Sequence, residues 1–171
     1  MRNPLSYSIW LMPSGVVKEQ LIHIIKELSI NYGGPVFEPH ITLISSFLGN
    51  KEELLQRTEK LASKITPFGL KLRGIKYLNE FFHSFFLDVE LTNDLKQARS
   101  AGLELFTCNE NEYRPHMSLA YGDITVPKKE KMKKGLSKLP GEFNVDNFFL
   151  AHNNESKLKW CVIQGFPLND K

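Results

Sequence analysis

Along the chain, short runs of apolar and β-preferring residues, typical of strands, alternate with segments in which apolar residues recur every three or four positions, typical of helices. Together these patterns predict the elements. The run from Tyr7 to Pro13 is rich in apolar and β-preferring residues, so it predicts a first strand. After Val17 the apolar residues recur every three or four positions, which predicts an amphipathic helix that ends at Gly33-Gly34-Pro35. The apolar face of this helix would consist of Leu21, Ile24, Ile25 and Leu28.

The middle of the chain continues this alternation of strands and helices. Asn50 followed by Glu53 has the pattern of a helix N-cap with a capping box. Asn79-Glu80 separates two β-type runs and is expected to turn a hairpin. The elements expected here are strand 41–47, helix 50–64, strands 70–78 and 81–91, and helix 93–106.

The last third is expected to contain one more helix, opened by Thr125 and Pro127, because proline is favoured in the first turn of a helix. Polar residues predict a loop over 109–112 and a turn over 153–155. The strands expected in this part are 116–121, 142–151 and 158–166.

This mixture of elements places the fold in the α+β class. Several connections between strands are too short for a helical crossover, so we expect antiparallel sheets with helices packed outside. Two short strands begin with Pro-His, and each is followed by a helix start nine or ten residues later. We therefore expect residues 1–171 to form a single domain built from two pseudo-symmetric lobes.

The composition is that of a soluble globular domain, because 42% apolar and 24% charged residues exclude a disordered chain. The apolar run 8–12 is stopped by Pro13, far short of the 18 or so residues that would span a membrane, and no signal-like cleavage region follows it. Cys108 and Cys161 do not form a disulfide framework and suit a reducing compartment. We expect a cytoplasmic protein that does not contact a membrane.

The charge is modest, with 22 Lys and Arg against 19 Asp and Glu, a net charge of +3. The densest basic stretch, 128–134, is expected to be the solvated face of a helix. So small and scattered a charge does not predict tight binding along a nucleic acid backbone. We expect a monomer that binds a small anionic ligand and forms no stable nucleic acid complex.

The most informative motifs are Pro39-His40-Ile41-Thr42-Leu43 and Pro115-His116-Met117-Ser118-Leu119, two copies of P-H-x-[ST]-L. Residues two apart on a strand point to the same face, about 6.6 Å apart along it, so each imidazole shares a face with a hydroxyl. The proline before each histidine favours a strand start or edge, a position that can border a cleft.

Two histidines that face each other across a cleft can divide acid and base work near neutral pH, because imidazole has an ordinary pKa of about 6.5. Two hydroxyls can hold an anion between them. Phosphoester cleavage needs these parts and requires no metal or cofactor. Either motif alone is explained more simply by a structural histidine, and a metal site would need further ligands, for which Glu38 and Glu112 are candidates.

In these motifs the chain resembles the 2H phosphoesterase superfamily, which is marked by two H-x-[ST] motifs. It most resembles the cyclic nucleotide phosphodiesterase branch, and the resemblance extends to residues 7–13, 34–42 and 119–121. The resemblance implies a bilobal fold in which two antiparallel β-sheets line a central cleft.

The resemblance also implies a reaction. Nucleoside 2′,3′-cyclic phosphates would be opened to 2′-phosphates, and ADP-ribose 1″,2″-cyclic phosphate to the 1″-phosphate, with no metal and no cofactor. His40 and His116 would be the catalytic acid and base, in an order that the sequence leaves open. Thr42 and Ser118 would bind the phosphate oxygens.

Trp10 and Tyr121 are the candidate walls for the nucleobase, because aromatic faces stack on bases and the resemblance carries both into the site. Tyr121 lies five positions after His116, so on a continuous strand the two side chains would point to opposite faces. Tyr121 can therefore reach the same cleft only from beyond the end of the strand. We expect His83 to belong to an aromatic core run and His152 to a turn.

Two other functions stay open. The RNA-ligase-like branch of the same superfamily handles 2′,5′ linkages or RNA ends, but it often carries more arginine around the second motif, where this chain has Arg114. A nucleotide- or RNA-binding module that lost the chemistry would retain a cyclic nucleotide without converting it. The sequence does not identify the pathway; the candidates are the conversion of tRNA-splicing by-products and the scavenging of RNA ends.

Overall fold

The structure is a computed structural model that describes residues 6–108, 112–154 and 157–170. Its strands are β1 (Ser6–Leu11), β2 (Ile41–Phe47), β3 (Phe68–Lys76), β4 (Phe85–Val89), β5 (His116–Ala120), β6 (Glu142–Val145), β7 (Asn147–Asn154) and β8 (Lys159–Pro167). Its helices are α1 (Gly15–Tyr32), α2 (Lys51–Ala62), α3 (Asn93–Leu105) and α4 (Val126–Gly135). The expected α+β class is confirmed.

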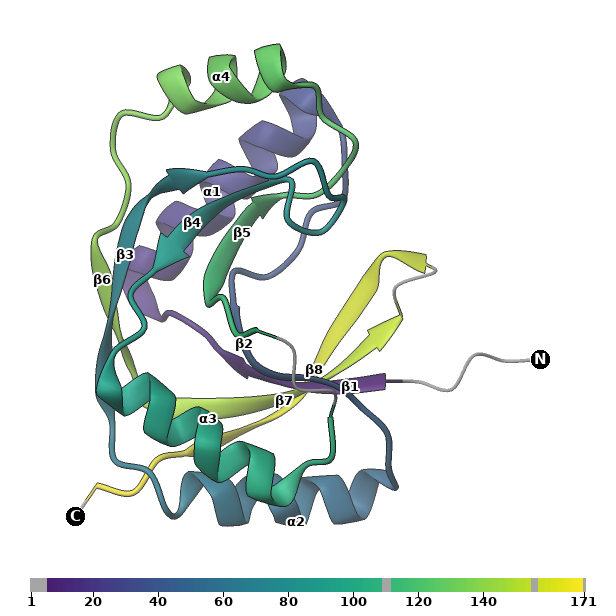
Figure 1. Cartoon of the computed structure of the whole chain (residues 1–171), viewed down its shortest axis with the longest axis vertical. Helices are drawn as coiled ribbons and strands as arrows, with labels where there is room; N and C mark the ends of the chain where they lie inside the picture. Colours follow the sequence, from purple (N-terminus) through teal and green to yellow (C-terminus); the bar gives the residue numbers. More distant parts are fainter. Residues whose placement is uncertain (1–5, 109–111, 155–156, 171) are drawn as a thin grey trace.

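The eight strands form one sheet in the order β6-β3-β4-β5-β2-β1-β7-β8, and every neighbouring pair is antiparallel. The sheet is strongly curved, and its two halves diverge toward one side of the molecule, between β5 and the β7–β8 hairpin (Figure 1). At its centre β2 and β5 share one described residue pair, Ile41 opposite Met117. The two sheets that we expected are therefore two four-stranded halves of one sheet, joined where the two Pro-His motifs meet.

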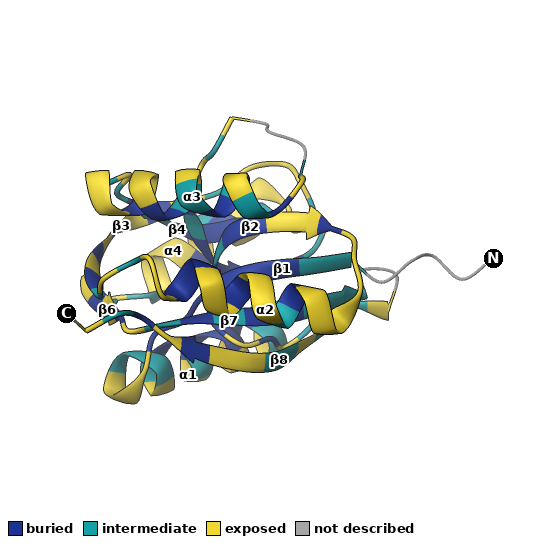
Figure 2. Ribbon diagram, turned by 90° about the horizontal axis from the view of Figure 1, so that it is seen from below, coloured by how far each residue is buried: buried dark blue, intermediate teal, exposed yellow. Residues whose placement is uncertain are grey.

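The helices lie outside the curled sheet and tie its two halves together. Helix α1 follows β1 but packs against β5 of the other half, and α3 follows β4 but packs against β2. Helix α2 covers β7 and β8. Each helix turns its buried positions toward the sheet and its exposed positions outward (Figure 2). On α1 the buried residues are Leu21, Ile24, Ile25 and Leu28, the apolar face that the sequence predicted.

Helix starts follow the capping signals of the sequence. The Asn50 side chain accepts hydrogen bonds from the backbone N–H groups of Glu52 (2.9 Å) and Glu53 (3.4 Å) at the start of α2. Thr92 caps α3 in the same way, through the N–H of Leu95 at 3.3 Å. Pro127 lies in the first turn of α4, as expected.

The hairpin expected at Asn79-Glu80 is wrong in its extent. Strand β4 begins at Phe85 rather than Phe81, and residues 77–84 form a longer connection. Within this connection the N–H of Leu78 donates to the carbonyl of His83 at 3.0 Å. The carbonyl of Phe81 accepts from the N–H of Gly122, just after β5, also at 3.0 Å. Because these backbone groups are paired here, residues 77–84 do not continue the strand ladder. His83 therefore lies in the connection and not in the expected core strand.

The strand expected over 142–151 is divided at Asp146. Its first part, β6, pairs with β3, whereas its second part, β7, pairs with β1 and β8. The carbonyl of Asp146 accepts a hydrogen bond from the N–H of Leu168 at 2.9 Å. One continuous apolar pattern thus supplies an edge strand to one half of the sheet and an inner strand to the other, which the pattern alone does not reveal.

The basic stretch 128–134 is not wholly solvated. Lys129 is 1% exposed, and its ammonium group donates to the carbonyl of Leu78 at 2.7 Å. Burial lowers the pKa of Lys129 below its ordinary value. Asn153 and Asn154 of the expected turn 153–155 belong instead to the end of β7, where they pair with β8; Glu155 and residues 109–111 of the expected loop lie outside the described residues. None of the described helices is long and apolar enough to cross a membrane.

Candidate active site

A cavity of about 460 Å³ lies where β1, β2, β5 and the connection 77–84 meet. Five of the six candidate residues line it: Trp10, His40, Thr42, His116 and Tyr121. Ser118 does not belong to the lining; it lies two residues beyond His116 on β5 and is 4% exposed. The fold thus brings both motifs to one cavity from positions far apart in the sequence.

The two histidines are held in the same way. Nδ1–H of His40 donates to the carbonyl of Glu38 at 2.7 Å, and Nδ1–H of His116 donates to the carbonyl of Arg114 at 2.9 Å. A carbonyl oxygen can only accept, so Nδ1 carries the proton in both neutral rings. Nε2 is then the basic nitrogen of each ring.

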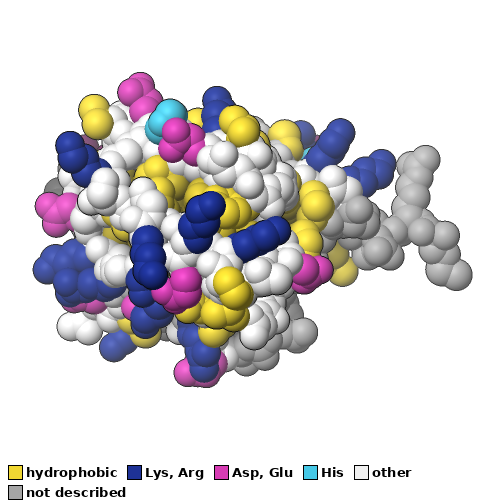
Figure 3. Space-filling view, turned by 90° about the horizontal axis from the view of Figure 1, so that it is seen from above, with side chains coloured by type: hydrophobic (Ala, Val, Ile, Leu, Met, Phe, Trp, Pro, Cys, Tyr) yellow, Lys and Arg dark blue, Asp and Glu magenta, His cyan; other side chains and the backbone are white. Residues whose placement is uncertain are grey.

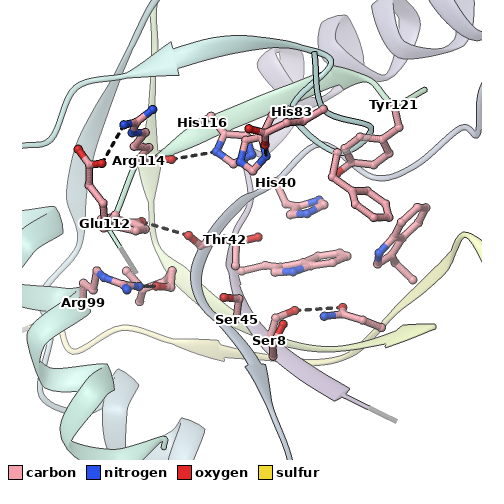
Figure 4. A pocket seen from close by; sticks show the side chains of 18 of the residues that line it. Ser8, His40, Thr42, Ser45, His83, Arg99, Glu112, Arg114, His116 and Tyr121 are labelled. Carbon is pink, nitrogen blue, oxygen red and sulfur yellow. Dashed lines mark hydrogen bonds and ion pairs between the residues drawn. The ribbon is translucent and has the colours of Figure 1, made fainter. Parts of the chain in front are cut away.

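Trp10 forms a platform beneath His40. Their ring centroids are 3.6 Å apart and their planes differ by 8°, so the two rings are stacked. Trp10 pairs with Thr42 across the β1–β2 ladder, which places all three side chains around one point of the cavity. Figure 4 shows His40 and His116 close together above Thr42.

Both histidines are shifted toward the neutral form. Burial lowers the pKa of His40 from 6.5 to about 4; the hydrogen bond to Glu38 opposes this shift and the neighbouring His116 adds to it. Burial also lowers the pKa of His116, against the hydrogen bond to Arg114. Asp88 raises the pKa of His116 and His83 lowers it.

His83 lies directly beside His116, with 4.4 Å between the ring centroids. Its Nδ1 is 3.0 Å from a carboxylate oxygen of Glu80. Both residues line the cavity, as does Phe82 of the same connection. The assignment of His83 to a core strand is therefore wrong, because the connection 77–84 carries it to the cavity.

The backbone of β2 is clamped beside Thr42. The Tyr113 hydroxyl donates to the carbonyl of Thr42 at 3.1 Å, and the Arg99 guanidinium donates to the carbonyl of Leu43 at 2.6 Å. Arg99 also lies 4.0 Å above the Tyr113 ring. Burial raises the pKa of Tyr113 above its ordinary value, so its hydroxyl stays protonated and donates.

Aromatic rings form the opposite wall. Tyr121 stacks on Phe37 with centroids 4.1 Å apart, and Phe82 and Trp160 each lie 5.4 Å from Tyr121. Strand β5 ends at Ala120, so Tyr121 lies just beyond the strand, which is the condition for its reaching the cleft. Gly34 has φ +93°, and a Cβ there would lie 2.5 Å from the carbonyl oxygen of Tyr121, so glycine permits this close approach.

The polar and aromatic sides of the cavity are separated. In Figure 4 Arg99, Glu112 and Arg114 lie on one side of the three histidines and Tyr121 on the other. Arg114 pairs with Glu112 at 2.8 Å. Among the described residues no group of three or more His, Cys, Asp and Glu side chains is placed to hold a metal ion.

A family model described as "Cyclic phosphodiesterase-like protein" matches residues 5–168. The chain belongs to this family. The resemblance to the cyclic phosphodiesterase branch of the 2H phosphoesterases is thereby confirmed, and the protein is an enzyme.

Two curated relatives of this cyclic phosphodiesterase-like chain carry related names. A cyclic phosphodiesterase of Arabidopsis thaliana is 23% identical over 75% of this chain and 71% of its own length. A 2′,3′-cyclic-nucleotide 3′-phosphodiesterase of Yarrowia lipolytica is 27% identical over 90% of this chain and 87% of its own length.

Solved structures share the fold of this family member. TT0787 of Thermus thermophilus superposes with a TM-score of 0.66 at 20% identity, covering 97% of this chain and 99% of the other. LigT of E. coli, solved with 3′-AMP, superposes with a TM-score of 0.62 at 15% identity, covering 98% and 100%.

Sequence reasoning missed several residues of the cavity in this cyclic phosphodiesterase-like chain. Trp160, Phe82 and His83 are sequence-distant from both motifs, and no spacing links them to a strand face of the site. Tyr113 and Arg114 had a usable signal, since they directly precede the second Pro-His. The other lining residues that the sequence did not single out for the cavity are Ser8, Leu43, Ser45, Ser46, Leu78, Glu80, Arg99, Glu112 and Asn153.

Proposed function

We propose that the protein hydrolyses cyclic phosphates on ribose without a metal ion. Its substrates are nucleoside 2′,3′-cyclic phosphates, opened to 2′-phosphates, and ADP-ribose 1″,2″-cyclic phosphate, opened to the 1″-phosphate. The observation that carries the proposal is the meeting of His40 and His116 at one cavity, each with Nδ1–H fixed on a backbone carbonyl. The name of the Yarrowia relative, a 3′-phosphodiesterase, supports cleavage at the 3′ oxygen.

The two histidines take different roles. His40 has its pKa lowered to about 4, so Nε2 is unprotonated in the free enzyme and is suited to act as the base. Burial lowers the pKa of His116 as well, but the hydrogen bond to Arg114 and the negative charge of Asp88 oppose that shift, so we assign the acid to His116. A bound phosphate anion favours protonation of His116 further.

The reaction balances with these two groups alone. Nε2 of His40 removes a proton from water while the water oxygen attacks phosphorus. The bond from phosphorus to the ribose 3′ oxygen breaks in line with the attack, and His116 gives its Nε2 proton to that oxygen. The product carries its phosphate on the 2′ oxygen, and proton exchange with solvent restores both histidines.

The hydroxyls that follow the histidines bind the phosphate oxygens. Thr42 lines the cavity on β2, beside the Trp10 platform. Ser118 is buried on β5 two residues from His116 and does not line the cavity; we propose that its hydroxyl donates to a phosphate oxygen bound beside His116. Hydrogen bonds to these oxygens stabilise the charge that develops on them in the transition state.

The nucleobase binds on the aromatic side. Tyr121, Phe82 and Trp160 provide ring faces and edges there, and stacking of a base on such a surface contributes about 1–3 kcal/mol. Trp10, which the sequence suggested as a wall for the base, is proposed instead to contact the ribose and phosphate, because one face of its ring is already stacked on His40.

A small free substrate agrees with the surface charge. On the face around α4, basic side chains alternate with acidic and apolar ones (Figure 3). This supports our proposal that the protein forms no stable nucleic acid complex. We also propose that it acts as a cytoplasmic monomer.

The test is the identity of the product in the presence of EDTA. We expect wild-type protein to convert 2′,3′-cyclic AMP to adenosine 2′-phosphate, and ADP-ribose 1″,2″-cyclic phosphate to the 1″-phosphate, as identified by phosphorus NMR. A His116→Asn variant purified in the same way controls for contaminating phosphodiesterases. Retention of both compounds without turnover would contradict the proposal and favour a binding module. Activity that EDTA abolishes and Zn²⁺ or Mg²⁺ restores would contradict the metal-free mechanism.

A further inference from the structure

A second cavity of about 590 Å³ continues the first one past His116. The two cavities share five lining residues: Leu78, His83, Tyr113, Arg114 and His116. The shared wall contains one proposed catalytic group, the histidine beside it and an arginine. A ligand in the first cavity can therefore extend into the second without leaving the protein surface.

The second cavity has its own apolar floor. This floor comes from β3, β4, the residues that follow each of these strands and the residue before β5: Ile75, Tyr77, Phe86, Leu91 and Pro115. The Tyr77 ring is held in place, since its hydroxyl is hydrogen-bonded to Glu130 and the Lys129 ammonium lies 5.8 Å from its centroid. The proposed mechanism uses none of these apolar side chains.

The charged groups around this floor are mainly basic. Lys76 lies 2.8 Å from Asp88 and so is paired, whereas Lys133 reaches the cavity from the exposed face of α4. Arg114 lies where the two cavities join, and its guanidinium is paired with the exposed carboxylate of Glu112 at 2.8 Å, so a phosphate there would bind beside this pair or displace Glu112. A guanidinium at that place can bind a phosphate group that links two parts of one ligand.

We propose that the second cavity is a subsite for a second nucleoside, joined through phosphate to the 5′ carbon of the reacting ribose. Its base packs on the ring of Tyr77 and on Leu91, and its linking phosphate pairs with Arg114. The first cavity then holds the cyclic phosphate and the group on the 1′ carbon. This inference rests on the proposed function and adds that the enzyme favours substrates of dinucleotide size over mononucleotides.

Two sources could supply such a ligand: an RNA 3′ end with a 2′,3′-cyclic phosphate, and ADP-ribose 1″,2″-cyclic phosphate. Both carry a nucleoside linked through phosphate to the 5′ carbon of the reacting ribose. The linkage is a phosphodiester in the first and a pyrophosphate in the second. The experiment therefore compares both with a mononucleotide.

The experiment measures kcat/KM for 2′,3′-cyclic AMP, for the dinucleotide ApA ending in a 2′,3′-cyclic phosphate, and for ADP-ribose 1″,2″-cyclic phosphate. We expect at least one of the two larger substrates to exceed cyclic AMP by about 10- to 100-fold, mainly through a lower KM, as one stacked base contributes. The substrate that gains identifies the source.

The matched variants are Leu91→Trp, which fills the second cavity, and Leu48→Trp, which adds the same ring to another exposed leucine outside both cavities. Leu91→Trp should remove the advantage of the larger substrate and leave turnover of cyclic AMP unchanged. Leu48→Trp should behave as wild type. Equal kcat/KM for all three substrates, or an advantage that survives Leu91→Trp, would overturn the subsite while leaving the proposed function intact. Absence of turnover with every substrate would overturn both.

Discussion

At the residue scale, the tautomer of each histidine is set by the backbone two residues before it. The carbonyls of Glu38 and Arg114 accept from Nδ1, and in both cases a proline separates the acceptor from the histidine. The proline fixes an extended backbone before the ring and removes a competing N–H donor. The Pro-His pair thus fixes Nδ1 of each ring on the backbone and leaves Nε2 as the nitrogen available to the cavity.

The lowered pKa values of both histidines predict an acid-shifted rate profile. The productive free enzyme has one neutral and one protonated histidine, and both pKa values lie below 6.5. We therefore expect kcat/KM to peak on the acid side of pH 6.5 and to fall tenfold per pH unit well above it, as His116 loses its proton. A kcat/KM that rises between pH 6.5 and 8.5 would contradict this.

A His83→Asn variant separates the two limbs of that profile. Burial lowers the pKa of His116 and the hydrogen bond to Arg114 raises it; of the charged groups nearby, His83, which lies beside Glu80, lowers it and Asp88 on β4 raises it. Removing His83 should move the alkaline limb of kcat/KM to higher pH and leave the acid limb in place. His23→Asn, at an exposed position of α1, is the control and should leave both limbs unchanged.

At the element scale, α4 positions the connection 77–84 that forms one wall of the cavity. Lys129 donates to the carbonyl of Leu78, and Glu130 is bonded to the hydroxyl of Tyr77. Phe82 and His83 follow on the same connection and line the cavity. The buried Lys129 of the basic helix α4 thus holds the backbone of the connection 77–84 in place by a hydrogen bond from outside the cavity.

Replacing Lys129 with methionine should loosen this wall. The variant keeps the aliphatic stem but leaves the carbonyl of Leu78 without its donor, which costs about 1–3 kcal/mol of unfolding free energy. Urea denaturation should show this loss, and KM for 2′,3′-cyclic AMP should rise. Lys131→Met, on the exposed side of α4, is the control. Equal stability of the two variants would show that the Lys129 bond does not hold the connection.

Local patterns predicted most elements but not where chain segments change direction. The caps at Asn50 and Thr125-Pro127 and the apolar face of α1 are encoded within a few residues, so they were predictable. The division at Asp146 and the connection 77–84 depend on which distant strand accepts the backbone hydrogen bonds. No local periodicity contains that information.

At the scale of the whole molecule, the site lies where the two halves of the sheet meet. One described residue pair joins β2 to β5, and both histidines lie within one residue of that pair. Helices α1 and α3 each start in one half and pack on the other, which fixes the halves relative to each other. The separation of His40 and His116 is thus set by the packing of two helices rather than by a long strand ladder.

The sequence predicted that the two motifs meet at one site, but it did not predict how many other residues line that site. Two copies of P-H-x-[ST]-L pointed to His40, Thr42 and His116, all of which line one cavity. Trp160 and Phe82 also line this cavity, because the curvature of the sheet brings distant segments together. No local sequence pattern around either residue indicates this contact. Burial of Lys129 likewise follows from tertiary packing.

The most direct measurement is a double-variant cycle of kcat/KM for 2′,3′-cyclic AMP, using wild type, His40→Asn, His116→Asn and the double variant. The account predicts that each single variant loses roughly 10²- to 10⁴-fold and that the double variant loses little more than the worse single one, because both histidines act in one step. A single variant with wild-type kcat/KM, or a double loss equal to the product of the two, would contradict a joint acid–base mechanism.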